Sequence, residues 1–174
     1  MPKLAPILLA ESEPNDALLL RRAFAKVRIP NPLMVVEDGQ QAIDYLGRKG
    51  PYKDTVEFPW PSLMLLSLRL PLLDGKEVLS WWKNHNCGIE LPIIVITSIA
   101  SPSQIEEIMS LGAADYRFKP RDFDELVGLA HELRFGWIEH RVSAIKPPPG
   151  LPYAATSGNG TGSRSSPSNP SMRS

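Results

Sequence analysis

Polar side chains that could do chemistry follow short apolar runs at four points along the chain. Each run has the length of a β-strand, and the polar residues come directly after it or close behind it. They are Glu11, Ser12 and Glu13; Ser67 and Arg69; Thr97 and Ser98; and Lys119. Carboxylates can bind a cation, a hydroxyl with a base beside it can act as a nucleophile, and an ammonium group can pair with an anion.

Ser67 is the candidate nucleophile, but the sequence offers it no suitable base. A serine hydroxyl is not ionised at neutral pH and needs an adjacent base to attack. No histidine follows any of the apolar runs, which argues against an enzyme. Lys119 raises a different requirement, because a buried ammonium without a partner is costly. We expect Glu11 to be that partner.

The elements that must position these residues alternate along the chain. Strands are predicted from apolar runs without polar alternation, which is typical of a parallel sheet buried on both faces: Ile7–Ala10, Leu33–Val36, Leu63–Ser67, Ile93–Thr97 and Tyr116–Phe118. Helices are predicted between them from amphipathic spacing: Pro14–Val27, Gln40–Arg48, Gly75–His85, Pro102–Leu111 and Phe123–Arg141. Right-handed crossovers then give an α/β fold, a doubly wound five-stranded parallel sheet with helices on both faces. In such sheets ligands bind beyond the carboxyl ends of the strands, where the polar residues fall.

Local signals define several helix ends. Pro14 is predicted at the first helical position, and Ser101 and Gln104 have the spacing of a capping box. Asp122 and Glu125 have the same spacing ahead of the last helix.

Composition excludes several classes of protein. The chain has 174 residues, with 19 basic and 19 acidic side chains and one cysteine. A single cysteine rules out an internal disulfide and a multi-cysteine zinc site. The balanced charge argues against a nucleic-acid binder, and no apolar run approaches the roughly 18–20 residues of a membrane span. We therefore expect a cytoplasmic protein with no nucleic-acid or membrane partner.

The C-terminal segment differs in composition from the rest. Of the 28 residues in 147–174, six are proline, four are glycine and seven are serine. Such a segment cannot bury a core. We expect a folded domain over residues 1–143 and a disordered Pro/Ser/Gly-rich tail over 144–174.

Motifs at the strand ends resemble those of response-regulator receiver domains, the CheY-like single-domain bacterial receivers in particular. The matching stretches occur in the right order over about 130 residues: Ile7–Asp16, Val36–Leu46, Pro61–Gly75, Pro92–Ser98 and Leu111–Pro120. The resemblance implies a flavodoxin-like (βα)5 fold with strand order 2-1-3-4-5. It also implies a role in two-component phosphorelay signal transduction.

The resemblance places the phosphoacceptor aspartate of the family at Ser67. A serine phosphate would be a stable ester, unlike the labile acyl phosphate on which receivers depend. The family's acidic pair falls on Glu11 and Ser12, with the metal-coordinating position at Ser12. Since magnesium requires carboxylate oxygens, two serines at these positions predict weak magnesium binding at most and no other cofactor. The chain is therefore expected to be a pseudo-receiver that is not phosphorylated at Ser67.

The other half of the family site is intact. Thr97 matches the hydroxyl residue that follows the phosphoryl group, Lys119 matches the lysine that pairs with it, and Tyr116 matches the aromatic switch position. An alternative interpretation keeps Thr97 and Lys119 only as elements of the fold. The family often has a cis bond at Lys119-Pro120.

The remaining candidates are weaker. Cys87 is expected in a turn as an unreactive thiol, and the histidines as surface residues. Only one of the adjacent Trp81 and Trp82 can face the sheet.

Two function classes remain open. The first is a signalling module that acts by protein–protein contact, with a sensor histidine kinase or another signalling protein as partner. The second is an enzyme or small-ligand binder that reuses the strand-end site. Phe135 and Trp137 near the end of the last helix give the first class a candidate output face and a candidate homodimer contact. We rank the signalling module first and expect no enzymatic activity, because the sequence offers Ser67 no base.

Overall fold

The sheet has the strand order that the sequence predicts. The computed structural model describes residues 4–98 and 100–139 of the chain. Over these residues, β1 (Ile7–Ala10), β2 (Leu33–Val36), β3 (Leu63–Ser67), β4 (Ile93–Thr97) and β5 (Asp115–Phe118) form a parallel sheet in the order β2-β1-β3-β4-β5. The predicted doubly wound fold is confirmed. The predicted tail, 144–174, lies outside the described residues.

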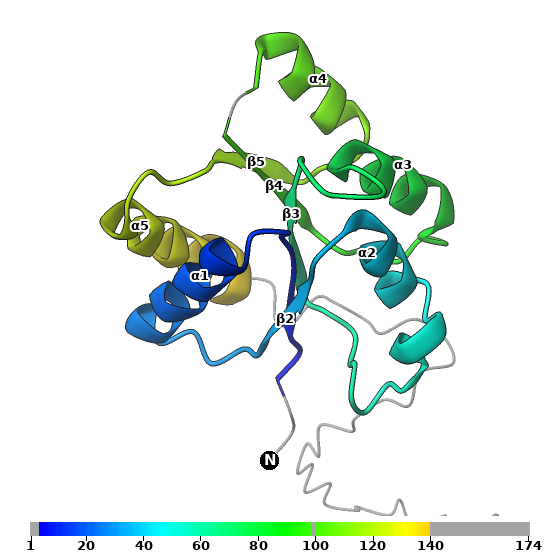
Figure 1. Ribbon diagram of the computed structural model, residues 1–174, viewed down its shortest axis with the longest axis horizontal. Helices are drawn as coiled ribbons and strands as arrows, with labels where there is room; N and C mark the ends of the chain where they lie inside the picture. The colour runs from blue at the N-terminus through cyan, green and yellow to red at the C-terminus, as the bar shows by residue number, and fades with distance from the viewer. Residues whose placement is uncertain (1–3, 99, 140–174) are drawn as a thin grey trace, which may run out of the picture.

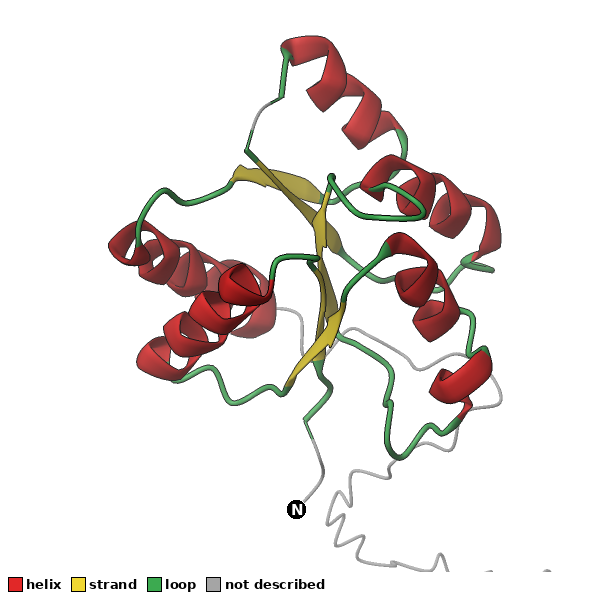
Figure 2. Cartoon of the chain, viewed as in Figure 1, coloured by secondary structure: helices red, strands yellow, loops and turns green. Residues whose placement is uncertain are grey.

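Helices cover both faces of the sheet. One face carries α1 (Pro14–Val27) and α5 (Phe123–Leu133), and the other carries α2 (Gly39–Leu46), α3 (Gly75–His85) and α4 (Pro102–Ser110), as Figures 1 and 2 show. A short 3-10 helix, Gly50–Lys53, lies in the long connection between α2 and β3. None of the described helices is both long and apolar enough to cross a bilayer.

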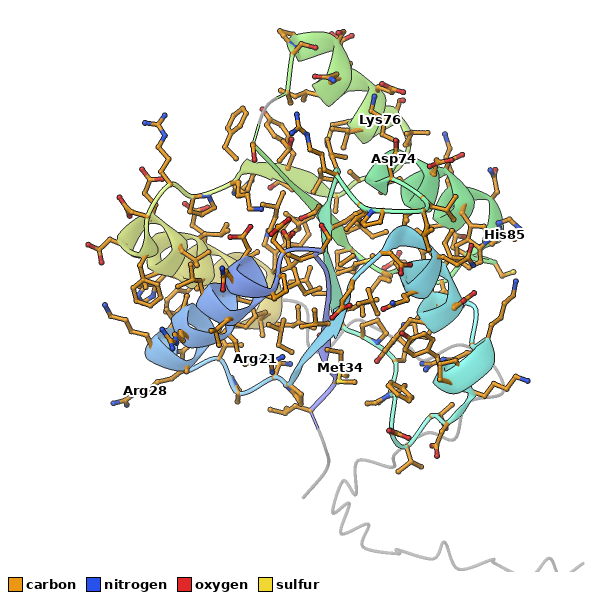
Figure 3. All side chains as sticks on the ribbon, viewed as in Figure 1. Arg21, Arg28, Met34, Asp74, Lys76 and His85 are labelled. Atoms are coloured by element: carbon orange, nitrogen blue, oxygen red, sulfur yellow. The ribbon has the colours of Figure 1, made fainter. Side chains whose placement is uncertain are left out.

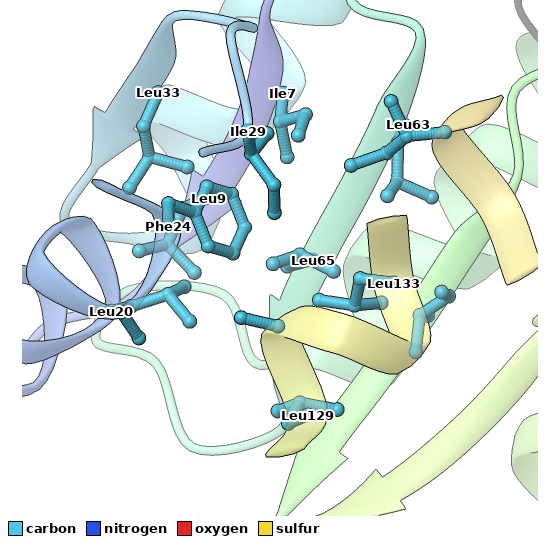
Figure 4. Close-up of a cluster of buried hydrophobic side chains, with 14 of the residues drawn as sticks. Ile7, Leu9, Leu20, Phe24, Ile29, Leu33, Leu63, Leu65, Leu129 and Leu133 are labelled. Atoms are coloured by element: carbon cyan, nitrogen blue, oxygen red, sulfur yellow. The ribbon is translucent and has the colours of Figure 1, made fainter. Parts of the chain in front are cut away.

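Two apolar clusters fill the space between the sheet and its helices. The first lies under α1 and α5 and includes Leu9, Phe24, Leu65 and Leu133 (Figure 4). The second lies under α2, α3 and α4 and includes Leu8, Met64, Leu79 and Trp82. Every residue of β1, β3 and β4 is buried, which explains why these strands lack polar alternation. Trp82 is buried and Trp81 is only half-buried, as the adjacent pair predicted.

Most predicted helix ends are confirmed. Pro14 occupies the first turn of α1, and Ser101 and Gln104 form the predicted reciprocal capping box of α4. The box predicted at the start of α5 is only half present. Asp122 accepts from the Glu125 N–H at 2.8 Å, but the Glu125 carboxylate accepts from the Arg121 N–H at 2.9 Å instead of that of Asp122.

The last helix differs from its prediction. The α-helix ends at Leu133, and a π-helical turn, Arg134–Ile138, follows it; Arg141 lies outside the described residues. In an α-helix, residues five apart point about 140° away from each other. The wider π turn brings them onto one side. Leu133 (1% exposed) and Ile138 (7% exposed) can therefore both face the first cluster.

The loop between β3 and α3, which borders the polar strand ends, is held by two glycines. The Gly75 N–H donates to the Leu68 carbonyl at 2.9 Å, and the Gly39 N–H donates to the Pro71 carbonyl at 3.3 Å. A Cβ atom on Gly75 would lie 2.6 Å from the Ser67 carbonyl oxygen, and one on Gly39 would overlap the carbonyl of Leu73. Neither helix start has room for a side chain, so the loop is fixed in place.

We expect Gly75→Ala to destabilise the protein by about 1–3 kcal/mol, because the added methyl group must displace the backbone of β3. Gly128→Ala is the matched control, since a Cβ atom at Gly128 meets no neighbour within 4 Å. That substitution should stabilise α5 by about 0.5–1 kcal/mol. Urea unfolding of both variants measures the difference, and equal effects would show that the loop is not clamped.

Candidate functional site

The polar residues predicted at the strand ends surround one cavity. It has a volume of about 250 Å³ and lies at the carboxyl ends of β1, β3, β4 and β5. Its walls are formed by Glu11, Ser12, Glu13, Ser67, Leu68, Arg69, Ile96, Thr97, Ser98 and Lys119. The cavity exceeds the roughly 30 Å³ that one water molecule occupies in the liquid, so it has room for a ligand of several atoms.

Glu11 is the centre of this site. Its side chain is buried, and a buried carboxylate must be paired. The Oε2 atom accepts the Ser67 hydroxyl at 2.6 Å and the Lys119 ammonium at 3.3 Å, and the Oε1 atom accepts the Glu13 N–H at 3.0 Å. The predicted pairing of Glu11 with Lys119 is confirmed. Both carboxylate oxygens of Glu11 are thus engaged inside the protein.

Asp16 belongs to the same network, and sequence reasoning missed it. Its Oδ2 atom lies 2.5 Å from the Lys119 ammonium, which therefore sits between two carboxylates. In the sequence Asp16 reads only as an acidic residue in the first turn of a helix, where it complements the helix dipole. No local spacing connects it to a lysine more than a hundred residues away.

The surroundings of Lys119 keep it charged. Partial burial alone would lower the pKa of the ammonium group. Hydrogen bonds and electrostatic attraction from Asp16 and Glu11 outweigh that effect, and the pKa lies above its ordinary value of 10.5. Lys119 is therefore a permanent cation at physiological pH.

Ser67 is buried and is a hydrogen-bond donor in this network. The Glu11 carboxylate orients its hydroxyl at 2.6 Å, which makes Glu11 the only base that the described residues place beside it. This carboxylate also pairs with Lys119 and accepts the Glu13 N–H. The network therefore holds the Ser67 hydroxyl in place as a donor.

The side chains present do not fit the magnesium site of the resembling family. The resemblance assigns metal coordination to Ser12, which is half-buried, and the phosphoacceptor role to Ser67, and neither side chain offers a carboxylate. Glu11 already has partners on both oxygens, and Glu13 is exposed on the rim of the cavity. Within the described residues, no group of three or more His, Cys, Asp and Glu could hold a metal ion.

The switch positions are only partly brought together. Thr97 is buried in the cavity wall, and its carbonyl accepts the Lys119 N–H at 2.7 Å. Tyr116 does not line the cavity; it packs on the second cluster, with its ring edge-on to Phe118 at 6.0 Å between centroids. The Lys119-Pro120 bond is trans, so the expectation of a cis bond was wrong here.

Other candidate side chains lie away from the cavity. Cys87 is exposed in a turn with a positive φ angle of 50°. His85 is stacked on Trp81, and His131 is exposed on α5 beside Phe135. His140 lies outside the described residues.

We expect Lys119→Met to lower the free energy of unfolding by about 1–3 kcal/mol, since it leaves the buried Glu11 without its cation. Lys76→Met is the matched control, because Lys76 pairs with the exposed Glu107 at 2.6 Å and such surface pairs contribute about 0–1 kcal/mol. When the pKa of a lysine is higher in the folded state than in the unfolded state, its ion pair stabilises the fold fully at any pH below the unfolded-state pKa. That stabilisation is lost as the pH rises through the folded-state pKa. The difference between wild type and Lys119→Met should therefore be constant from neutral pH to about pH 10 and close above it. A difference that is absent at neutral pH, or that persists well above pH 10, would contradict this assignment.

Comparisons with known proteins agree with the geometry. The profile of the response regulator receiver domain matches residues 7–131. The chain is 32% identical over 133 residues to the probable methanogenesis regulatory protein FilR2 of Methanothrix harundinacea, which covers 76% of this chain and 83% of FilR2. It is 29% identical over 133 residues to the response regulator Rcp1 of Synechocystis, which covers 76% of this chain and 88% of Rcp1.

Solved structures resemble it over most of its length. The Mn²⁺-bound form of the response regulator Rcp1 matches with a TM-score of 0.70 and 28% identity, over 84% of this chain and 99% of that one. The response regulator RPA3017, in red light signaling of R. palustris, matches with a TM-score of 0.76 and 28% identity, over 83% of this chain and 100% of that one. The chain belongs to the response-regulator receiver family of two-component signalling and has the flavodoxin-like fold of that family.

Proposed function

We propose that this chain is a receiver that accepts no phosphoryl group at Ser67 and signals by protein–protein contact. The observation that carries the proposal is the hydrogen bond from Ser67 to Glu11. At this position the family has an ionised carboxylate that attacks phosphorus, whereas Ser67 presents a neutral hydroxyl that is already used as a donor. The proposal makes the chain a signalling module in the cytoplasm and not an enzyme, with a sensor histidine kinase or another signalling protein as its partner.

The charge balance of the site supports the same conclusion. Glu11 and Asp16 share Lys119, and no other carboxylate of residues 4–98 and 100–139 pairs with this lysine. A receiver with an aspartate at position 67 would hold a further negative charge there and would need a cation to offset it. The serine removes both the nucleophile and the need for magnesium. The site then rests in one arrangement without a phosphoryl group.

Restoring the two carboxylates tests this proposal. Wild type incubated with acetyl phosphate and magnesium should keep its mass, and the double variant Ser12→Asp/Ser67→Asp should gain one phosphoryl group. Ser12→Asp/Ser67→Asn is the matched control, because asparagine has the shape of aspartate without its nucleophilic oxygen. Intact-protein mass spectrometry measures the mass of the wild type and of both double variants. Magnesium-dependent labelling of Ser67 in the wild type would overturn the proposal.

Magnesium titration provides an independent test. The wild type should show no saturable change in tryptophan fluorescence at sub-millimolar magnesium, since Ser12 and Ser67 supply no charged ligand. The double aspartate variant should bind. Saturation of the wild type in this range would show that Glu11 and Glu13 suffice as ligands.

The end of α5 is the proposed contact surface for a partner or a second copy. Phe135 is 50% exposed, and Trp137 is half-buried against the first cluster. Phe118 on β5 and Met109 on α4 are further exposed apolar side chains, which lie outside this contact surface. Because a two-fold pair uses one patch twice, a homodimer would cover this surface.

Phe135→Ala separates an output surface from a piece of the core. It should reduce self-association or kinase binding in sedimentation experiments while leaving stability within about 1 kcal/mol, because half of the side chain is already exposed. Trp137→Ala should instead lower stability, since Trp137 packs on the core. A monomeric wild type without partner binding would contradict the surface assignment.

A further inference from the structure

A second cavity lies next to the first, on the side of α3 and α4. Its volume is about 270 Å³, and it is lined by Leu68, Arg69, Asp74, Lys76, Thr97 and Gln104. Leu68, Arg69 and Thr97 line both cavities. Figure 3 shows Asp74 and Lys76 at the start of α3, facing the side on which α4 lies. Lys119, the lysine of the receiver site, is not part of this wall.

Arg69 is a cation without a partner among the residues that the structure describes. Its guanidinium has no ion pair and donates no hydrogen bond to any of the described residues. A guanidinium offers a planar fork of N–H donors that matches the oxygens of phosphate or carboxylate. Arg69 can therefore bind an anion without breaking an existing contact.

The other polar groups of this wall also leave donors available. Lys76 donates to the Glu107 carboxylate at 2.6 Å, which uses one of its three N–H groups. Gln104 accepts the Ser101 N–H through its carbonyl oxygen, so its amide N–H₂ group is left to donate. Asp74 is the acidic residue that lines this cavity, and its carboxylate already accepts the Glu77 N–H as the N-cap of α3.

We propose that this second cavity binds a phosphate group without forming a covalent bond, between Arg69, Lys76 and the Gln104 amide. Of the two cations in the wall, Lys76 is already paired with Glu107, whereas Arg69 has no acidic partner among the described residues. Phosphate has more acceptor oxygens than a carboxylate, so it can accept from Arg69, Lys76 and the Gln104 amide at once. The ligand is either free phosphate or a phosphate ester of a small molecule. The proposal does not depend on whether Ser67 can be phosphorylated.

The test is thermal unfolding of the full chain with increasing inorganic phosphate, compared with chloride at the same ionic strength. Phosphate should raise the melting temperature to a plateau, and Arg69→Gln should weaken binding at least about tenfold. Phenyl phosphate in a parallel arm identifies the source: tighter binding than phosphate indicates an ester, and weaker binding indicates the free ion. Lys83→Gln, at the far end of α3, is the control that should bind like wild type.

Gln104→Glu is the decisive variant. Glutamate at this position keeps the capping box of α4, so the protein should fold with its stability intact. Its added carboxylate should abolish phosphate binding. Lys119→Gln, which alters the receiver cavity but not the wall of the second cavity, should keep it.

Three results would overturn the proposal. They are the absence of a plateau, equal binding by wild type and Gln104→Glu, and loss of binding in Lys119→Gln but not in Lys76→Gln. The last result would place the anion in the receiver cavity. A mass spectrum of a parallel sample treated with acetyl phosphate and magnesium keeps the two proposals apart, because a gain of one phosphoryl group at Ser67 would contradict the proposed function and not the second cavity.

Discussion

The structure of this site depends on one buried negative charge. Glu11 directly follows β1, and its carboxylate can be buried only because a hydroxyl, an ammonium and a backbone N–H surround it. These partners come from the ends of β3 and β5 and from the turn before α1. The same carboxylate therefore fixes the relative positions of three segments that are distant in the sequence.

The identity of residue 67 determines what this charge can do. An aspartate there would be a second acceptor facing Glu11, and the repulsion between the two would require a cation between them. A serine is a donor, so it satisfies Glu11 directly. A serine at position 67 therefore joins the network of Glu11, Asp16 and Lys119 without adding a further negative charge.

Sequence reasoning predicted the fold well because its signals are local. The apolar run Leu63–Ser67 and the helix Pro14–Val27, with proline in its first turn, carry their own boundaries. The pairing of Glu11 with Lys119 could also be predicted, because a buried lysine needs a carboxylate and few are at the strand ends. The role of Asp16 could not be predicted, because an acidic residue in the first turn of a helix gives the same sequence signal whether or not it belongs to a site. The π turn after Leu133 escaped prediction for a similar reason: the apolar spacing continues, and only the packing of Ile138 shows that the helix widens.

Gly75 has a consequence for how members of this family are recognised. It is required because the backbone of β3 occupies the space where a side chain would be, a demand that is unrelated to phosphoryl transfer. The Asp74-Gly75 pair is therefore a signature of the receiver fold, whereas residue 67 bears on phosphoryl transfer. The two features can be inherited separately. A survey that counts active receivers by their scaffold signatures would include this chain, whereas one that reads residue 67 together with residue 12 would set it apart.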